Sequence, residues 1–172
     1  MIYYHGSIDG NIKEFNISNR KLYITTSRLV ALTYISKSFP NMFKTAEDGR
    51  ECYIDIVDGL YEAVTKKQSG YIYTLDVDDA IEVLQDNNCG HKHCYYSISN
   101  VKILKKEKVE DLYQELLFFE EKGEFFIKRA NEISEENRKR AIQSICKTYE
   151  GLKKPLKGKR DFMYLLIPNK QH

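Results

Sequence analysis

The stretch Lys21–Tyr34, KLYITTSRLVALTY, decides the fold, because its periodicity changes within a few residues. Residues 21–25 are rich in β-branched and aromatic side chains, which predicts a strand. Ser27 stands where a helix cap is expected, and apolar residues then recur at helical spacing over 27–37. Pro40 closes the segment, so the sequence predicts a strand followed directly by a helix.

The chain before this stretch places a histidine at the end of its first strand. Residues 2–5, IYYH, predict a strand that stops at Gly6, and residues 6–20 are typical of turns and loop. Because glycine has no side chain, its backbone amide and carbonyl are expected to be open to a flat ligand such as a nicotinamide carboxamide. The imidazole of His5 is expected to hold a ribose hydroxyl, or else to bond a neighbouring group of the strand.

Two tyrosines complete the pattern. Tyr23 lies in the second strand and Tyr34 follows eleven positions later on the helix, so together they form a stacking slot if both approach His5. The arrangement resembles the ADP-ribosyltransferase fold, in its diphtheria-toxin-like and poly(ADP-ribose) polymerase-like branch, over about the first 35 residues. In that fold a His-Gly-Ser or His-Gly-Thr is followed by a strand tyrosine and by a helix tyrosine that stacks on nicotinamide.

This resemblance implies that NAD is the substrate and that ADP-ribose is transferred to an acceptor, either a protein or a nucleic acid. It implies that His5 binds the ribose, that Gly6 binds the carboxamide, and that the two tyrosines enclose the ring. The implied catalytic residues are His5 and Tyr23. The implied cofactor-binding residues are His5, Gly6, Ser7, Tyr23, Tyr34 and Arg28.

The chain departs from the family in two places. Ala31 stands where the polymerase branch usually has a serine that bonds nicotinamide, and the strand expected near 95–98 begins without the usual glutamate. Such a carboxylate stabilises positive charge that develops on the ribose, and losing a contact of this kind typically costs roughly 10²–10³ in rate. Glu51, Glu62 and Glu107 are candidate replacements by chemistry alone. Two functions therefore stay open, a transferase and a catalytically degenerate nucleotide-binding or interaction module.

Arginine offers a second route to a nucleotide. The RNA 2′-phosphotransferases, a related branch, work with His and Arg in place of that glutamate, and Arg20 or Arg28 is expected to reach a phosphate here. The alternative is that both are ordinary surface residues, one on a loop and one on a helix.

The rest of the chain predicts further short strands and two long helices. Strands are expected at 51–56, 60–64, 70–75, 95–98 and 101–104, the first two of them paired around the turn Asp58-Gly59. A loop is expected over 41–50, a brief helix from Asp76 through Leu84, a turn over 86–90, and longer helices over 109–123 and 134–151. The predicted fold is α+β, with a bent or split, mostly antiparallel sheet, a helix after the second strand and two C-terminal helices.

Composition favours a single globular domain over residues 1–172, since 42% of the residues are hydrophobic and 30% are charged. No apolar run reaches the roughly 18 residues of a membrane span. Four scattered cysteines suit reduced thiols, so a cytoplasmic protein without membrane partners is expected. The abundance of Lys, Ile, Asn and Tyr is typical of AT-rich bacterial coding sequences.

Basic side chains outnumber acidic ones at the C-terminal end of the chain. Residues 1–150 carry 21 basic and 24 acidic side chains, whereas residues 151–172 carry six basic and one acidic. The tail 152–172 is therefore expected to contact phosphates, to remain solvated, or to clasp the core through the apolar run 162–167.

A cluster of potential metal ligands, CGHKHC, occupies residues 89–94. One interpretation is a metal-stabilised, nucleic-acid-associated protein that binds zinc here and uses the basic tail. Four ligands within six residues cannot easily surround one ion tetrahedrally, so an exposed, metal-free turn is favoured and no residue is assigned to a metal.

Overall fold

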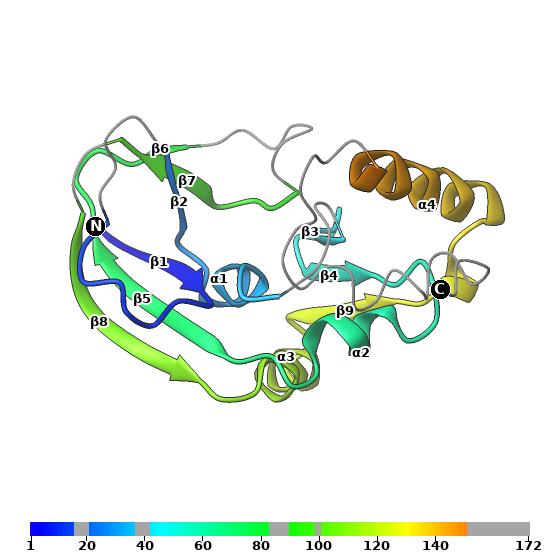
Figure 1. The fold of residues 1–172 in the computed structure, drawn as a ribbon, viewed down its shortest axis with the longest axis horizontal. Coiled ribbons are helices and arrows are strands. Elements are labelled where there is room, and N and C mark those ends of the chain that lie inside the picture. Colours follow the sequence, from blue (N-terminus) through cyan, green and yellow to red (C-terminus); the bar gives the residue numbers. More distant parts are fainter. Residues whose placement is uncertain (16–20, 37–41, 83–89, 99–100, 151–172) are drawn as a thin grey trace.

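The computed structural model describes residues 1–15, 21–36, 42–82, 90–98 and 101–150, and it has the predicted α+β fold (Figure 1). The helices in this part of the chain are α1 (Arg28–Thr33), α2 (Leu60–Thr65), α3 (Leu112–Glu121) and α4 (Glu135–Glu150), with a 3-10 turn, η1 (Ala130–Glu132). The strands are β1 (Ile2–Ser7), β2 (Leu22–Thr25), β3 (Phe43–Thr45), β4 (Glu51–Ile54), β5 (Gly70–Asp76), β6 (Ile81–Glu82), β7 (Cys94–Ser97), β8 (Lys102–Val109) and β9 (Phe125–Lys128).

The larger sheet consists of two leaves. Its strand order is β6-β7-β2-β1-β5-β8, and every neighbouring pair is antiparallel. β1 pairs with β5 along its whole length, and β2 does so with β7. Between β1 and β2, in contrast, a single residue pair joins the described residues, Tyr4 opposite Thr25. The leaf β6-β7-β2 therefore meets the leaf β1-β5-β8 at one point, which confirms the predicted split sheet (Figure 1).

The faces of this sheet are assigned by side-chain alternation. Tyr3, Tyr73 and Leu75 pack together on one face with Ile24 of β2. Ile72 lies on the other face, in the core that α1 helps to form. Because residues opposite each other on antiparallel strands share a face, these clusters fix the side on which each neighbouring residue emerges.

α1 begins as predicted and ends early. The Ser27 side chain accepts a hydrogen bond from the backbone N–H of Val30, which confirms the predicted cap. The helix ends at Thr33, and Tyr34 is its C-cap residue. The helix tyrosine therefore lies at the end of α1, next to the split between the leaves.

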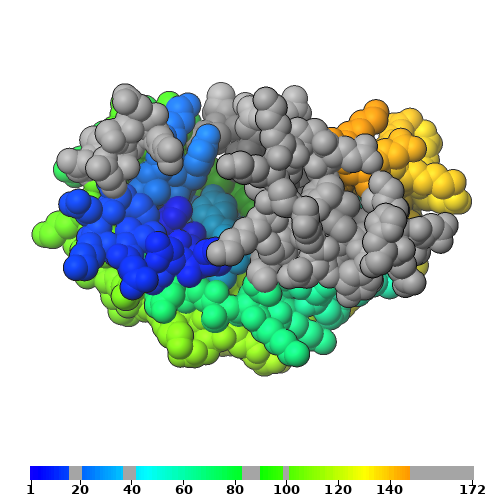
Figure 2. All heavy atoms as spheres, in the orientation of Figure 1, coloured from blue at the N-terminus to red at the C-terminus, as the bar shows by residue number. Residues whose placement is uncertain are grey.

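The second sheet and α4 lie toward the other end of the molecule, and α3 lies near the middle (Figure 1). β4 is antiparallel to β3 and parallel to β9. α3 is followed by Gly123 at φ +73°, and the Ser134 hydroxyl accepts a hydrogen bond from the N–H of Asn137, so the predicted stop and cap are both confirmed. Figure 2 shows β1 and its following loop (blue) on the surface at one end and α4 (orange) at the other.

The strand predicted at 60–64 is wrong, because these residues form α2. Leu60, Tyr61 and Val64 are buried along one side of the helix. The buried carboxylate of Asp55 accepts a hydrogen bond from the N–H of Tyr61, which satisfies a donor of the first turn. A short apolar run fits either structure, and here this contact and the core select the helix.

Other short elements also differ from the predictions. β3 lies within the predicted loop 41–50, where pairing with β4 holds it. The brief helix predicted from Asp76 is replaced by β6, and the Ser97 hydroxyl donates to the Asp79 carboxylate, which holds this segment against β7. The sequence does not predict β9. Pro40, Leu84, the turn from residue 86 through Cys89, Gly151, the run 162–167 and the basic tail lie outside the described residues.

Candidate functional site

His5 occupies the split between the two leaves. Its Nδ1 lies 2.8 Å from the carbonyl oxygen of Tyr23 on β2, and its ring contacts Phe15 edge-on at a centroid distance of 5.1 Å. A carbonyl oxygen only accepts hydrogen bonds, so Nδ1 carries the hydrogen and donates it. In the neutral ring Nε2 is then an acceptor, suited to a hydroxyl group such as that of a ribose.

The surroundings of His5 favour this neutral form. Burial lowers the pKa of His5 below its usual value of 6.5, because desolvation disfavours the imidazolium, while the hydrogen bond to the Tyr23 carbonyl opposes that shift. His5 is therefore uncharged at neutral pH, with its tautomer fixed by β2.

This lowered pKa predicts a pH-dependent contribution to stability. Below pH 6.5 the unfolded chain binds a proton at His5 that the folded chain does not, so stability falls as pH drops from 6.5 through the folded-state pKa. His5→Asn keeps a donor near the Nδ1 position and does not titrate. In urea unfolding, the stability advantage of the wild type over this variant should shrink between pH 7.5 and pH 5. A difference that is constant with pH would contradict the assignment.

Gly6 lets α1 approach β1. It is buried, and a Cβ atom built on it would lie 1.9 Å from the carbonyl oxygen of Ala31 and 3.3 Å from the Cβ of Tyr34. The sequence predicts that the backbone of Gly6 is open to a flat ligand, but α1 occupies the space beside this glycine. Its absent side chain positions α1 and Tyr34 beside His5.

The Tyr34 ring lies between three groups of the site. Its centroid is 6.3 Å from that of His5, with the ring planes tilted by 48°, and 6.4 Å from that of His91, which it meets edge-on. The Tyr34 hydroxyl lies 3.2 Å from the Sγ of Cys94, the first residue of β7. Tyr34 therefore connects the split to the start of β7.

Tyr23 lies on the same side of the sheet as Tyr34. Thr25 is opposite both Tyr4 and Cys94, and Tyr4 packs against the core that contains α1, so Thr25 and Cys94 face α1. Tyr23 is two residues from Thr25 and shares this face. Its side chain is 49% exposed, and no ring contact joins it to another aromatic residue in the described part of the chain. The two tyrosines thus share the α1 face, with the Tyr23 ring accessible. His5 lies opposite Tyr73 and so emerges on the other face of β1, and its ring comes within 6.3 Å of the Tyr34 ring across the split.

Ser7 and Arg28 are engaged in other contacts. The Ser7 hydroxyl accepts a hydrogen bond from the N–H of Asp9 and so stabilises the turn after β1. The guanidinium of Arg28 donates to Glu115 at 2.8 Å and lies 3.9 Å from Glu107. Its charge is balanced by carboxylates of α3 and β8. Arg20 lies outside the described residues.

The three candidate acids occupy different places. Glu107 pairs with Arg28 and with Lys105, and Glu62 pairs with Arg129. Glu51 alone of the three connects to the site, through His91 behind the Tyr34 ring. None of the three is within hydrogen-bonding distance of His5 in the described structure.

Glu51 and His91 form a buried pair that joins the two sheets. Glu51 of β4 is 6% exposed and His91 is 7% exposed, and Glu51 Oε2 accepts from His91 Nδ1 at 2.5 Å. Thr45 donates to the other carboxylate oxygen. His91 Nε2 lies 3.4 Å from the Thr33 hydroxyl, which itself donates to the Val30 carbonyl at 2.7 Å. Because the Thr33 hydroxyl already donates to the Val30 carbonyl, its oxygen is able to accept a hydrogen bond from Nε2 of His91.

This network corrects part of the interpretation of residues 89–94 as an exposed turn, because Lys92 and His93 do form an exposed turn. His91 and Cys94 are both buried, and His91 is held by Glu51. No group of three His, Cys, Asp or Glu side chains is placed to hold a metal ion within the described ranges, from which Cys89 is missing. The sequence signal for this site was weak, because Glu51 and His91 are far apart in the chain and match no motif.

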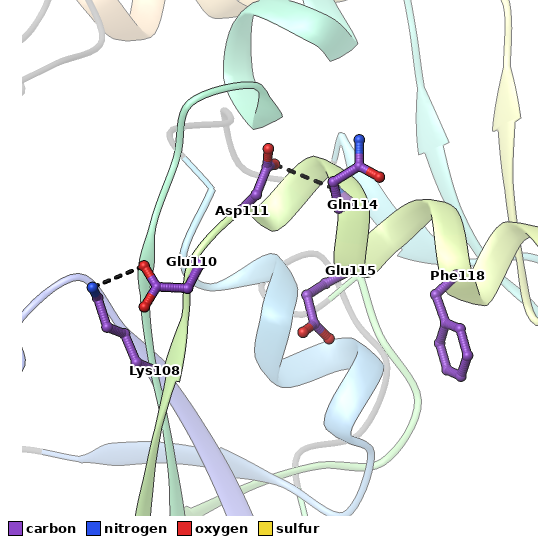
Figure 3. A pocket seen from close by; sticks show the side chains of 6 residues that line it. All are labelled: Lys108, Glu110, Asp111, Gln114, Glu115 and Phe118. Carbon is purple, nitrogen blue, oxygen red and sulfur yellow. Dashed lines mark hydrogen bonds and ion pairs between the residues drawn. The ribbon is translucent and has the colours of Figure 1, made fainter.

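A groove of about 470 Å³ lies elsewhere, where β8 leads into α3 (Figure 3). Its charged groups already have partners in the protein. Lys108 pairs with Glu110, Asp111 caps α3, and Glu115 binds Arg28. Phe118 is the exposed apolar residue at its edge. This groove is separate from the predicted slot.

Comparison with known proteins finds no relative of this chain. No family model, curated protein or solved structure matches the chain. Within the described residues, no helix combines the length and the apolar character needed to cross a membrane.

Proposed function

We propose that this protein binds NAD at the split between β1 and β2 and is an ADP-ribosyltransferase-like protein. The observation that carries the proposal is the placement of His5. Its Nδ1 is fixed by the Tyr23 carbonyl, which leaves Nε2 as an acceptor for a ribose hydroxyl, and its ring lies next to that of Tyr34. Among the described residues a single pair joins β1 to β2, and the facing edges of these strands are proposed to receive a ligand rich in donors and acceptors.

The tyrosines supply the proposed stacking surface. Tyr23 and Tyr34 share the α1 side of the sheet, and half of the Tyr23 side chain is accessible. Aromatic rings bind flat heterocycles mainly by stacking, typically worth about 1–3 kcal/mol for each ring. The nicotinamide ring is proposed to lie against Tyr34, and its carboxamide is not assigned to Gly6, because α1 fills the open side of that glycine.

The proposed reaction breaks the bond between the ribose C1′ and the nicotinamide nitrogen. Nicotinamide leaves with the electron pair, and a nucleophile of the acceptor forms a bond to C1′ and releases its proton to solvent. His5 and Tyr23 orient the ribose and the ring for this step. The acceptor is proposed to be a protein or a nucleic acid. The small number of scattered cysteines in the sequence suits a reducing, cytoplasmic setting.

A catalytically degenerate NAD-binding module is the second candidate. The observation that favours it is Cys94, because the strand that the resemblance expects to open with glutamate opens here with a buried thiol. A neutral thiol does not stabilise positive charge on the ribose as a carboxylate does. Binding without turnover is the expected behaviour of such a site.

Two measurements test the proposal and separate its two forms. Calorimetric titration of NAD into the purified chain should show saturable binding, whereas absence of binding at millimolar NAD would contradict both forms. Release of nicotinamide from NAD, followed by chromatography with and without a bacterial lysate as acceptor source, distinguishes a transferase from a binder. A transferase releases nicotinamide at a rate that the lysate increases.

Removing the Tyr34 ring should weaken NAD binding. Tyr34→Ala loses one stacking surface, and about 1–3 kcal/mol corresponds to a roughly 5- to 150-fold rise in Kd. Tyr34→Phe is the matched control, because it keeps the ring and loses the hydroxyl contact to Cys94. We expect its Kd to change by less than about threefold. Equal losses in both variants would show that the hydroxyl, and not stacking, matters.

A further inference from the structure

We propose that Glu51 and His91 are positioning residues that hold the Tyr34 ring in place from the second sheet. This inference rests on the proposed function in one respect, namely that Tyr34 is a wall of the NAD slot. The contacts themselves are independent of any ligand. They run from β4 through the buried pair to the edge of the Tyr34 ring.

The pair is rigidly held on the side away from Tyr34. Thr45 donates to the Glu51 carboxylate, and the same hydroxyl oxygen accepts the N–H of Lys92 at 2.8 Å. The N–H of Thr45 donates to the Gly90 carbonyl at 2.8 Å. Residues 90–92 are thereby attached to β3, and the His91 ring has little freedom to turn.

The pair also reaches α1 directly. His91 Nε2 lies 3.4 Å from the hydroxyl of Thr33, the residue before Tyr34. His91 thus approaches Tyr34 in two ways. Its Nε2 lies near the hydroxyl of Thr33, and the centroid of its ring lies 6.4 Å from that of the Tyr34 ring. On its other edge the Tyr34 hydroxyl reaches Cys94 at 3.2 Å. These contacts define the orientation of Tyr34 relative to His5.

The rate at which the Cys94 thiol is labelled measures whether the Tyr34 ring keeps this orientation, and the measurement needs no ligand. Cys94 is fully buried and touches the Tyr34 hydroxyl, so movement of the ring should uncover it. Cys52 is an internal control, because it is equally buried and lies next to Glu51 on β4 but does not touch Tyr34. Iodoacetamide labelling of the native chain, read peptide by peptide by mass spectrometry, gives both rates in one sample.

The variants test the pair and its surroundings separately. His91→Ala and Glu51→Ala should each raise the labelling rate of Cys94 at least tenfold while Cys52 stays protected. His91→Asn keeps a donor to Glu51 but lacks the ring, so it should fold and still expose Cys94. Glu62→Ala removes another partly buried carboxylate, one bound to Arg129, and should leave Cys94 protected. Tyr34→Ala sets the labelling rate expected when the ring is absent.

Several outcomes would overturn the proposal. Protection of Cys94 in both His91 variants would mean that Tyr34 is held without the pair, and protection in Tyr34→Ala would mean that the ring does not cover the thiol. Equal exposure of Cys94 and Cys52 would indicate general loosening. NAD affinity is read in the same variants, with about a tenfold rise in Kd expected for His91→Asn. If the wild type binds no NAD, the proposed function fails while the labelling still decides the positioning role.

Discussion

Gly6→Ala is expected to destabilise the protein by about 3 kcal/mol or more, because the new methyl group has no space. Its carbon would lie 1.9 Å from the Ala31 carbonyl oxygen and 2.9 Å from the carbonyl carbon. These are backbone atoms of α1, and the same oxygen accepts the N–H of Tyr34, so no side-chain rotation relieves the clash. The helix must move away from β1. Urea unfolding with an unchanged m-value measures the cost.

Gly10→Ala is the matched control for this substitution. A methyl group there would meet the far end of the Tyr71 ring, with Cζ at 2.3 Å, and that ring can swing away. We expect a cost below about 1 kcal/mol. If Gly6→Ala costs no more than Gly10→Ala, the close packing of α1 on β1 is wrong, and with it the placement of Tyr34 beside His5.

His5→Ala should produce the largest loss of NAD binding. It removes the Nε2 acceptor proposed for the ribose and leaves the Tyr23 carbonyl without its donor. A loss of about 3 kcal/mol is typical when a site group is left unpaired, which corresponds to a rise in Kd of more than about 100-fold. Calorimetric titration of the folded variant measures this change.

His5→Asn separates the binding role of His5 from its structural role. Asparagine retains a donor near the Nδ1 position, so the bond to the Tyr23 carbonyl and the fold are kept, but it has no group at the Nε2 position. We expect this variant to unfold at nearly the wild-type urea concentration at pH 7 and to bind NAD as poorly as His5→Ala. NAD binding at wild-type affinity in the asparagine variant would place the ribose contact elsewhere.

The first half of the site was predictable from the sequence because its signals are local. The first strand, the cap at Ser27 and the spacing of Tyr23 and Tyr34 depend on neighbours within one turn or one strand. The predicted stop at Gly6 is wrong, because β1 continues through Ser7. The split in the sheet agrees with the predicted fold class. The reason for Gly6 was not predictable, since the element that packs against a glycine is determined by the tertiary fold.

The part of the site formed by Glu51 and His91 depends on contacts between residues that are far apart in the sequence. Glu51 lies in β4 and His91 in the segment before β7, and nothing in the residues around either one indicates the other. The CGHKHC segment suggested metal chemistry or an exposed turn, whereas burial turned one of its histidines into the partner of a carboxylate. α2 shows the same limit on a smaller scale, because the short segment 60–65 becomes a helix through its contact with Asp55.

NAD is proposed to bind against His5 in the split between the leaves. The most direct test is NMR titration of NAD into protein labelled with ¹³C at histidine, with the His5 resonance assigned by its absence in His5→Asn. If NAD lies against His5, the Cε1–H signal of this residue moves progressively and saturates with the calorimetric Kd. NAD binding that saturates while this signal stays in place, or no binding at all, would contradict the account.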